Sequence, residues 1–126
     1  MTTVPAEKKT PLIEIFWNGT ILHLRPVGPN IGQREAPEIH DAVNPYFKEL
    51  GKSIRAMVLD LTDVQFMSSM GLGTCIALRN AAAGVGAQAI IFGMSKELQA
   101  LMLMMKIEKL YKIASTRDEL NKILGK

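Results

Sequence analysis

The chain has 126 residues, 48% of them hydrophobic and 21% charged, so it can bury the core of one ordinary domain and is not a disordered protein. Its formal net charge is only +3 and its lysines and arginines are scattered, so no nucleic-acid partner is expected. The longest uncharged run, residues 80–95, is interrupted by glycines, and the single cysteine, Cys75, cannot form an internal disulfide, so we expect a cytoplasmic protein without membrane insertion.

The N-terminal part of the chain predicts a tail followed by a hairpin. Residues 1–10 are polar and include a proline, so we expect a flexible tail there and one domain over residues 11–126. Two β-rich runs then flank Asn18-Gly19, the strongest short hairpin signal in a sequence. They predict antiparallel strands at Leu12–Trp17 and Thr20–Arg25.

A loop rich in glycine and proline leads to the first predicted helix. One apolar face at helical spacing carries the residues Ile39, Val43, Tyr46, Phe47 and Leu50. Pro37 suits the first turn of this helix, whereas Pro45 removes a backbone donor from its interior and predicts a kink or a helix split in two.

Strands and helices alternate over the rest of the chain. The unbroken apolar run "IRAMVLDL" predicts a strand at residues 57–61 that is covered on both faces. Further elements follow: a helix after the serines, a strand at 88–92, a helix capped by Ser95, a short strand at 110–114 and a last helix capped by Thr116. The order β-β-α-β-α-β-α-β-α predicts a mainly parallel sheet with right-handed crossovers.

The stretch "TDVQFMSSMGLG", residues 62–73, follows the carboxyl end of a predicted strand, where parallel sheets gather their functional loops. A nucleotide phosphate loop is disfavoured because Ile76 stands where a third glycine is needed and no G-K-[ST] is present. A catalytic serine is disfavoured because the histidines, His23 and His40, lie on a predicted strand and the first helix, and no G-x-S-x-G occurs. We therefore expect no enzyme activity.

The remaining interpretation places Ser69 at the N-cap of the following helix. Either Ser68 or Ser69 only caps that helix, or the same position serves as a phosphorylation switch, because a helix N-terminus accommodates a phosphate. The residues alone leave both alternatives open.

The stretch "LDLTDVQFMSSMGLG" resembles the signature of STAS domains, specifically of bacterial anti-sigma factor antagonists. In that family a buried strand ends in an Asp-containing turn, and Phe-[Met/Ile]-Asp-Ser-[Ser/Thr]-Gly-[Leu/Ile]-Gly then opens a helix. The matching residues are Phe66, Met67, Ser69, Gly71, Leu72 and Gly73. The resemblance implies an α/β fold with a single STAS domain, in which a mostly parallel mixed β-sheet begins with an N-terminal hairpin.

The resemblance also implies a function without enzyme activity, cofactor or metal. Members of the family bind an anti-sigma factor serine kinase, which phosphorylates them on the first serine of the motif and so regulates transcription. Carried over, the phosphorylated serine is Ser69. The implied partner-binding surface is Asn30, Met67, Ser68, Ser69, Met70, Gly71, Leu72 and Gly73. Its apolar members Met67, Met70 and Leu72 are expected to be presented to the partner.

Two departures from the motif modify this expectation. Ser68 replaces the family's Asp and Met70 replaces the following Ser or Thr, which makes Ser68 a second candidate acceptor. The alternative is a STAS scaffold or soluble subunit of a stress-sensing or lipid/anion transport complex, in which Ser69 is only a cap. The oligomeric state stays open between a monomer and a weak dimer.

Other conspicuous residues predict core positions. Cys75 lies on the apolar face of its helix and is expected to be buried. Met102 and Met105 are expected in the core, with only Met104 exposed.

Overall fold

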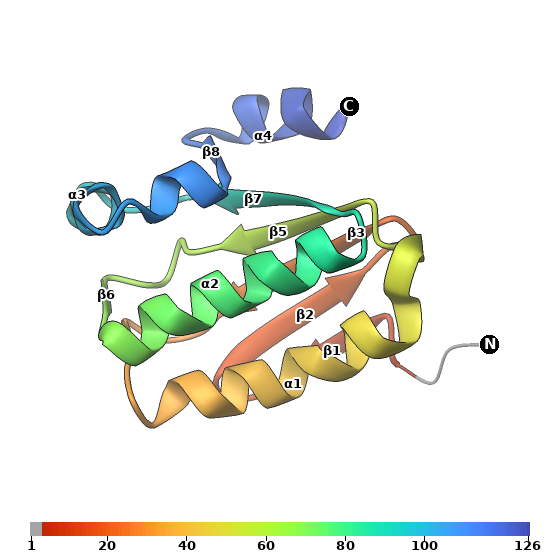
Figure 1. Ribbon diagram of the computed structural model, residues 1–126, viewed down its shortest axis with the longest axis horizontal. Helices are drawn as coiled ribbons and strands as arrows, with labels where there is room; N and C mark the ends of the chain where they lie inside the picture. Colours follow the sequence, from red (N-terminus) through yellow and green to blue (C-terminus); the bar gives the residue numbers. More distant parts are fainter. Residues whose placement is uncertain (1–3) are drawn as a thin grey trace.

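The computed structural model describes residues 4–126, which fold as a six-stranded mixed sheet flanked by helices (Figure 1). Sheet order is β1-β2-β3-β5-β7-β8, and β4 and β6 form a separate two-stranded sheet. The strands are β1 (Glu7–Lys9), β2 (Ile13–Trp17), β3 (Ile21–Pro26), β4 (Asn30–Ile31), β5 (Ala56–Asp60), β6 (Phe66–Met67), β7 (Gln88–Phe92) and β8 (Lys112–Ala114). The α-helices are α1 (Glu35–Leu50), α2 (Ser69–Gly84), α3 (Lys96–Met104) and α4 (Arg117–Leu124), with 3-10 helices η1 (Gly51–Ser53) and η2 (Ile107–Leu110).

The predicted hairpin is confirmed. Strands β2 and β3 pair antiparallel, with Trp17 opposite Leu22. Asn18 Oδ1 accepts hydrogen bonds from the amides of Thr20 at 2.9 Å and Ile21 at 2.7 Å, and Gly19 has a φ of 101°. Asn18 and Gly19 therefore form the turn as expected, because the Asn side chain accepts from nearby amides and glycine tolerates a positive φ.

The predicted parallel sheet is also confirmed. Strands β3, β5, β7 and β8 run parallel, and β5 and β7 are neighbours as expected. Every residue of β5 is buried, since Met57 and Leu59 belong to a core on one face and Ala56 and Val58 to a smaller core on the other. Helices α1 and α2 cover the first face, and α4 packs on the second through Leu120 (Figure 1).

The N-terminal segment is more ordered than expected. Residues 1–3 of the expected tail lie outside the described residues, but Glu7–Lys9 forms strand β1 and pairs antiparallel with β2. The Tyr46 hydroxyl donates to the Pro5 carbonyl at 2.8 Å, and the Trp17 amide donates to the Ala6 carbonyl at 2.8 Å. This segment therefore covers the outer edge of the hairpin, although its polar sequence predicted a flexible tail.

One of the two alternatives for Pro45 is excluded, and one other helix expectation needs correction. Helix α1 is not split in two: it runs from Glu35 to Leu50 through Pro45, which lies on its exposed side, where water can bind the carbonyl that loses its donor. Met105 is exposed rather than in the core, because α3 ends at Met104 and Met105 is only its C-cap residue. Met102 is buried and Met104 exposed, as predicted. None of the helices within residues 4–126 has the length and apolar content that a membrane span requires.

Candidate functional site

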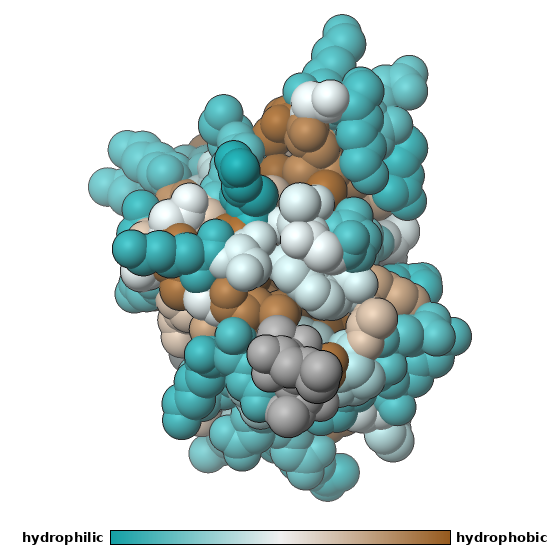
Figure 2. Space-filling model, turned by 90° about the vertical axis from the view of Figure 1, so that its right-hand side faces the viewer, coloured by the Kyte–Doolittle hydropathy of each residue, from teal (hydrophilic) through white to brown (hydrophobic). Residues whose placement is uncertain are grey.

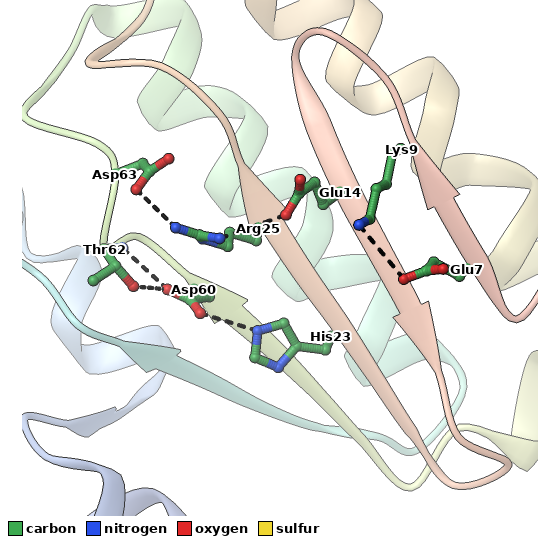
Figure 3. A network of polar contacts seen from close by, with 8 residues as sticks. All are labelled: Glu7, Lys9, Glu14, His23, Arg25, Asp60, Thr62 and Asp63. Atoms are coloured by element: carbon green, nitrogen blue, oxygen red, sulfur yellow. Dashed lines mark hydrogen bonds and ion pairs between the residues drawn. The ribbon is translucent and has the colours of Figure 1, made fainter.

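The loop that leaves β5 is tied to the hairpin by a buried carboxylate. Asp60, the last residue of β5, accepts hydrogen bonds from the Thr62 amide at 3.1 Å and from the Thr62 hydroxyl, and His23 Nε2 lies 3.0 Å from its Oδ2 (Figure 3). Burial raises the pKa of Asp60, but the hydrogen bonds with His23 and Thr62 outweigh burial, so the pKa lies below its ordinary value. The carboxylate stays ionised and fixes the start of the loop.

A second contact fixes the same loop two residues further on. Arg25 Nη2 donates to Asp63 Oδ1 at 2.9 Å, and Arg25 Nη1 lies 3.5 Å from Glu14 Oε1 (Figure 3). Strand β3 thus holds the loop through His23 and Arg25, both on the sheet face opposite α1 and α2. Asp60 and Asp63 are occupied by these partners, and no group of three or more metal-ligating side chains occurs within residues 4–126.

The short parallel sheet of β4 and β6 brings two distant loops together. Asn30 pairs with Phe66 and Ile31 with Met67. The Ser68 amide donates to the Ile31 carbonyl at 3.0 Å, and the Phe66 amide donates to the Pro29 carbonyl at 2.9 Å. The structure therefore places Asn30, an exposed residue that the resemblance implied as part of the partner surface, beside the serine turn.

The two serines have different roles in the structure. Ser68, not Ser69, is the N-cap of α2: its backbone is extended (φ −78°, ψ 177°) and its Oγ accepts from the Gly71 amide at 3.4 Å. Ser69 is the first residue of α2, is exposed, and its hydroxyl has no hydrogen-bond partner among residues 4–126. Ser68 thus does the capping that the motif's Asp would do, since both side chains suit an N-cap.

The two glycines of the motif also differ. A Cβ on Gly71 would lie 2.5 Å from the carbonyl oxygen of Ile31, so α2 can pack against β4 only if this residue has no side chain. A Cβ on Gly73 would meet nothing within 4 Å, and Gly73 is exposed. The fold accounts for Gly71 and leaves Gly73 unexplained.

Part of the expected partner surface is buried. Met67 and Leu72 lie in the hydrophobic core, so the expectation that they are presented to a partner is wrong; they support the turn from beneath. The Cys75 thiol donates to Met67 Sδ at 3.6 Å, and burial raises the pKa of this thiol to about 12, so it is unreactive as well as buried. Met70 remains as the exposed apolar neighbour of Ser69.

Sequence reasoning missed the contacts of His23 and Arg25 with the loop. Both residues alternate with the buried Leu22 and Leu24 along β3, which placed them on the other face of the sheet. The sequence shows Asp60 and Asp63 as an acidic pair. Only the pairing of β3 with β5 brings His23 and Arg25 close to them.

The chain was also compared with known proteins. The family model of the STAS domain matches residues 13–120. An anti-sigma factor antagonist from Mycobacterium paratuberculosis is 16% identical with a TM-score of 0.75, covering 90% of this chain and 93% of its own. A Planctomyces limnophilus STAS domain protein is 12% identical with a TM-score of 0.75, covering 89% of this chain and 96% of its own. The phosphorylated form of the Bacillus cell fate determinant SpoIIAA is 10% identical with a TM-score of 0.66, covering 88% and 98%. These structures share the fold of this chain.

Proposed function

Because the chain belongs to the STAS domain family, we propose that it is an anti-sigma factor antagonist that binds an anti-sigma factor serine kinase in the cytoplasm and is released when the kinase phosphorylates Ser69. One observation carries the proposal. Ser69 is the exposed residue at the start of α2 whose hydroxyl has no hydrogen-bond partner among the described residues, while Ser68 is engaged as the helix cap. The existence of a phosphorylated form of SpoIIAA, which has the same fold, supports it.

The start of α2 tolerates a phosphate without loss of the fold. The first amides of a helix have no intrahelical acceptor and carry partial positive charge. The first turn of α2 contains no acidic residue that would repel a phosphate. Phosphorylated Ser69 would therefore keep the native structure, with up to about two added negative charges.

The same phosphate is incompatible with an apolar contact. Phe66 and Met70, on either side of the serines, are both exposed. A partner that covers them removes water from Ser69, and an unpaired charge in such a contact is costly. A loss of about 2.8 kcal/mol weakens binding about 100-fold, enough to release the kinase.

The experiment uses purified serine kinases of the source organism, each incubated with this protein and ATP. We expect one kinase to add a single phosphate, which mass spectrometry maps to Ser69. Ser69→Ala should abolish the modification and Ser68→Ala should retain it. Ser69→Asp should fold normally and bind this kinase about 100-fold more weakly. Phosphate on Ser68 would assign the switch to the cap, and no modification by any kinase would leave the scaffold function.

A further inference from the structure

We propose that an open cavity between α3, η2 and β8 binds a small zwitterion with an apolar body, of which a free apolar α-amino acid is the simplest example. The Glu108 carboxylate accepts from the ammonium group of this ligand, and Lys96 pairs with its carboxylate. The cavity shares no residue with the serine turn, so the inference concerns a second site and does not rest on the proposed function.

The cavity has the size and the walls of a small-molecule site. Its volume is about 360 Å³, and such sites have volumes of about 300–1,000 Å³. Met102 is fully buried beneath it, whereas Leu103 is 64% exposed. An apolar group in the cavity therefore covers surface that otherwise faces water, which favours binding. The apolar part of the lining comes from Met94, Ala100, Met102, Leu103 and Ile113.

The lining also contains a carboxylate without a partner. Glu108 lies on η2, and its Oε2 is buried without a hydrogen-bond partner among residues 4–126. Among the partly or fully buried residues of this range, it alone has a buried side-chain oxygen or nitrogen in this state. Such a group is costly unless a donor reaches it. The carboxyl torsion of a glutamate is broad, so a small rotation presents an oxygen to a donor in the cavity.

A cation lines the same cavity but does not neutralise this carboxylate. Lys96, the first residue of α3, is exposed, and neither it nor Glu108 has an ion pair among the described residues. One acidic and one basic group thus face the cavity, and their charges cancel. A fatty acid would repel Glu108, and a simple amine would leave Lys96 unpaired. A zwitterion pairs with both groups and adds no net charge.

The surface next to the cavity is apolar as well. Helix α3 ends with Met104, which is 76% exposed, and its C-cap residue Met105 is 52% exposed. Exposed apolar residues that gather in one place indicate an interaction surface, and methionine side chains adapt their shape to a ligand. Lys106 then has a left-handed backbone (φ 60°), and this turn leads into η2, which returns Glu108 to the cavity.

The opposite end of the molecule offers no equivalent site. Helix α3 lies at the end away from both termini (Figure 1), and Figure 2 shows the other end, where hydrophilic residues dominate. A hollow between α4 and the starts of β3 and β5 is lined there by Ile21, Ala56, Ile123 and Leu124 beside Arg55. None of the described residues that line this hollow is acidic, so it lacks the acceptor that Glu108 supplies at the other end.

The experiment titrates the ¹⁵N-labelled full chain with L-leucine and follows the amide signals by NMR. We expect saturable shifts in α3, η2 and β8 with a Kd below about 1 mM. Glu108→Gln keeps the shape of the side chain but removes its charge, and should weaken binding at least about tenfold. Glu97→Gln is the matched control, because Glu97 is exposed on α3 outside the lining. It should leave the Kd within about twofold of wild type.

Changes to the ligand test each of its groups separately. N-acetyl-leucine has no ammonium group and should bind at least about tenfold more weakly than leucine. Leucinamide has no carboxylate and should bind only about threefold more weakly, because Lys96 is exposed to water. Glycine has no apolar body and should also bind at least about tenfold more weakly. Ala100→Phe should fill the cavity and abolish leucine binding, and circular dichroism confirms that this variant folds.

Several outcomes would overturn the inference. If Glu108→Gln binds leucine as wild type does, or if N-acetyl-leucine binds as leucine does, the carboxylate contacts no ammonium group. No saturable shift with leucine, isoleucine, valine, methionine or phenylalanine up to about 10 mM has the same consequence. If no amino acid binds and Leu103→Lys turns a self-associating protein into a monomer in sedimentation, a second copy of the chain covers the cavity and the inference is wrong.

Discussion

Helices α1 and α2 have the same length of 16 residues and cover the same face of the sheet, but their solvent-facing sides differ. The exposed residues of α1 include Glu38, His40, Asp41, Lys48 and Glu49, as expected for a helix that faces water. The exposed residues of α2 are uncharged: Ser69, Met70, Gly73, Ile76, Asn80, Ala83 and Gly84. Packing against the sheet does not by itself explain the difference, because both helices bury residues in the core on the same face of the sheet.

The two helices also begin differently. The first turn of α1 contains Glu35 and Glu38, whose negative charges face the positive end of the helix dipole. The first turn of α2 contains no acidic residue and is capped by the neutral Ser68. The start and the exposed side of α1 therefore suit contact with water. The start and the exposed side of α2 suit a phosphate and a partner instead.

The largest expected effect tests the inner side of α2. Gly71→Ala should destabilise the protein by about 3 kcal/mol, because the added methyl meets the Ile31 carbonyl at 2.5 Å and the two-stranded sheet must shift. Urea unfolding measures the change. Gly73→Ala, two residues away, should have the opposite sign. Equal effects of the two substitutions would contradict the distinction between the inner and outer sides of α2.

The next effect tests whether the loop that leads from β5 to the serine turn is held from the other side of the sheet. Asp60→Asn should lower the free energy of unfolding at pH 7 by about 2 kcal/mol, since charged hydrogen bonds with His23 and Thr62 are lost. Asp41→Asn on α1 is the matched control and should change it by no more than about 0.5 kcal/mol.

The pH dependence of stability tests the same contribution of Asp60. The pKa of Asp60 in the folded protein lies below the ordinary value of 3.8, because its hydrogen bonds outweigh its burial. Its stabilising contribution is therefore complete above this pH and is lost as the pH falls through the folded-state pKa. Acid unfolding of Asp60→Asn should lack this component. An acid transition identical to that of wild type would show that the carboxylate does not hold the loop.

A smaller effect tests the assignment of the helix cap. Ser68→Ala should cost about 1 kcal/mol of stability, as the loss of an N-cap does. Ser69→Ala should change stability by no more than about 0.5 kcal/mol, because its hydroxyl is exposed and has no partner among the described residues. Thermal unfolding of the two variants in parallel measures both. The reverse order would make Ser69 the cap and remove the free acceptor hydroxyl.

The smallest effect concerns the open start of α2. Phosphorylation of Ser69 should stabilise the protein by about 0.5 kcal/mol at low salt, through the helix dipole, and the gain should shrink as salt is added. Unfolding of the phosphorylated and unmodified protein at two salt concentrations checks it. A destabilised phosphoprotein would mean that the start of α2 does not accommodate the phosphate.

The sequence by itself determined the features that depend on neighbouring residues. The Asn18-Gly19 turn, the caps at Ser95 and Thr116, and a buried strand at residues 57–61, observed at Ala56–Asp60, were predicted, because turn geometry, capping and burial pattern act within a few residues. The motif around Ser69 indicated the family through its resemblance to the STAS signature.

Only the tertiary structure decided how the serine turn is built. The pairing of β4 with β6 places Asn30 beside the turn, fixes Ser68 rather than Ser69 as the cap, and buries Met67. The contacts of His23 and Arg25 with Asp60 and Asp63 follow from the register of β3 against β5. These features join residues about 40 positions apart, and loop-closure entropy makes such contacts depend on the whole fold rather than on any short stretch.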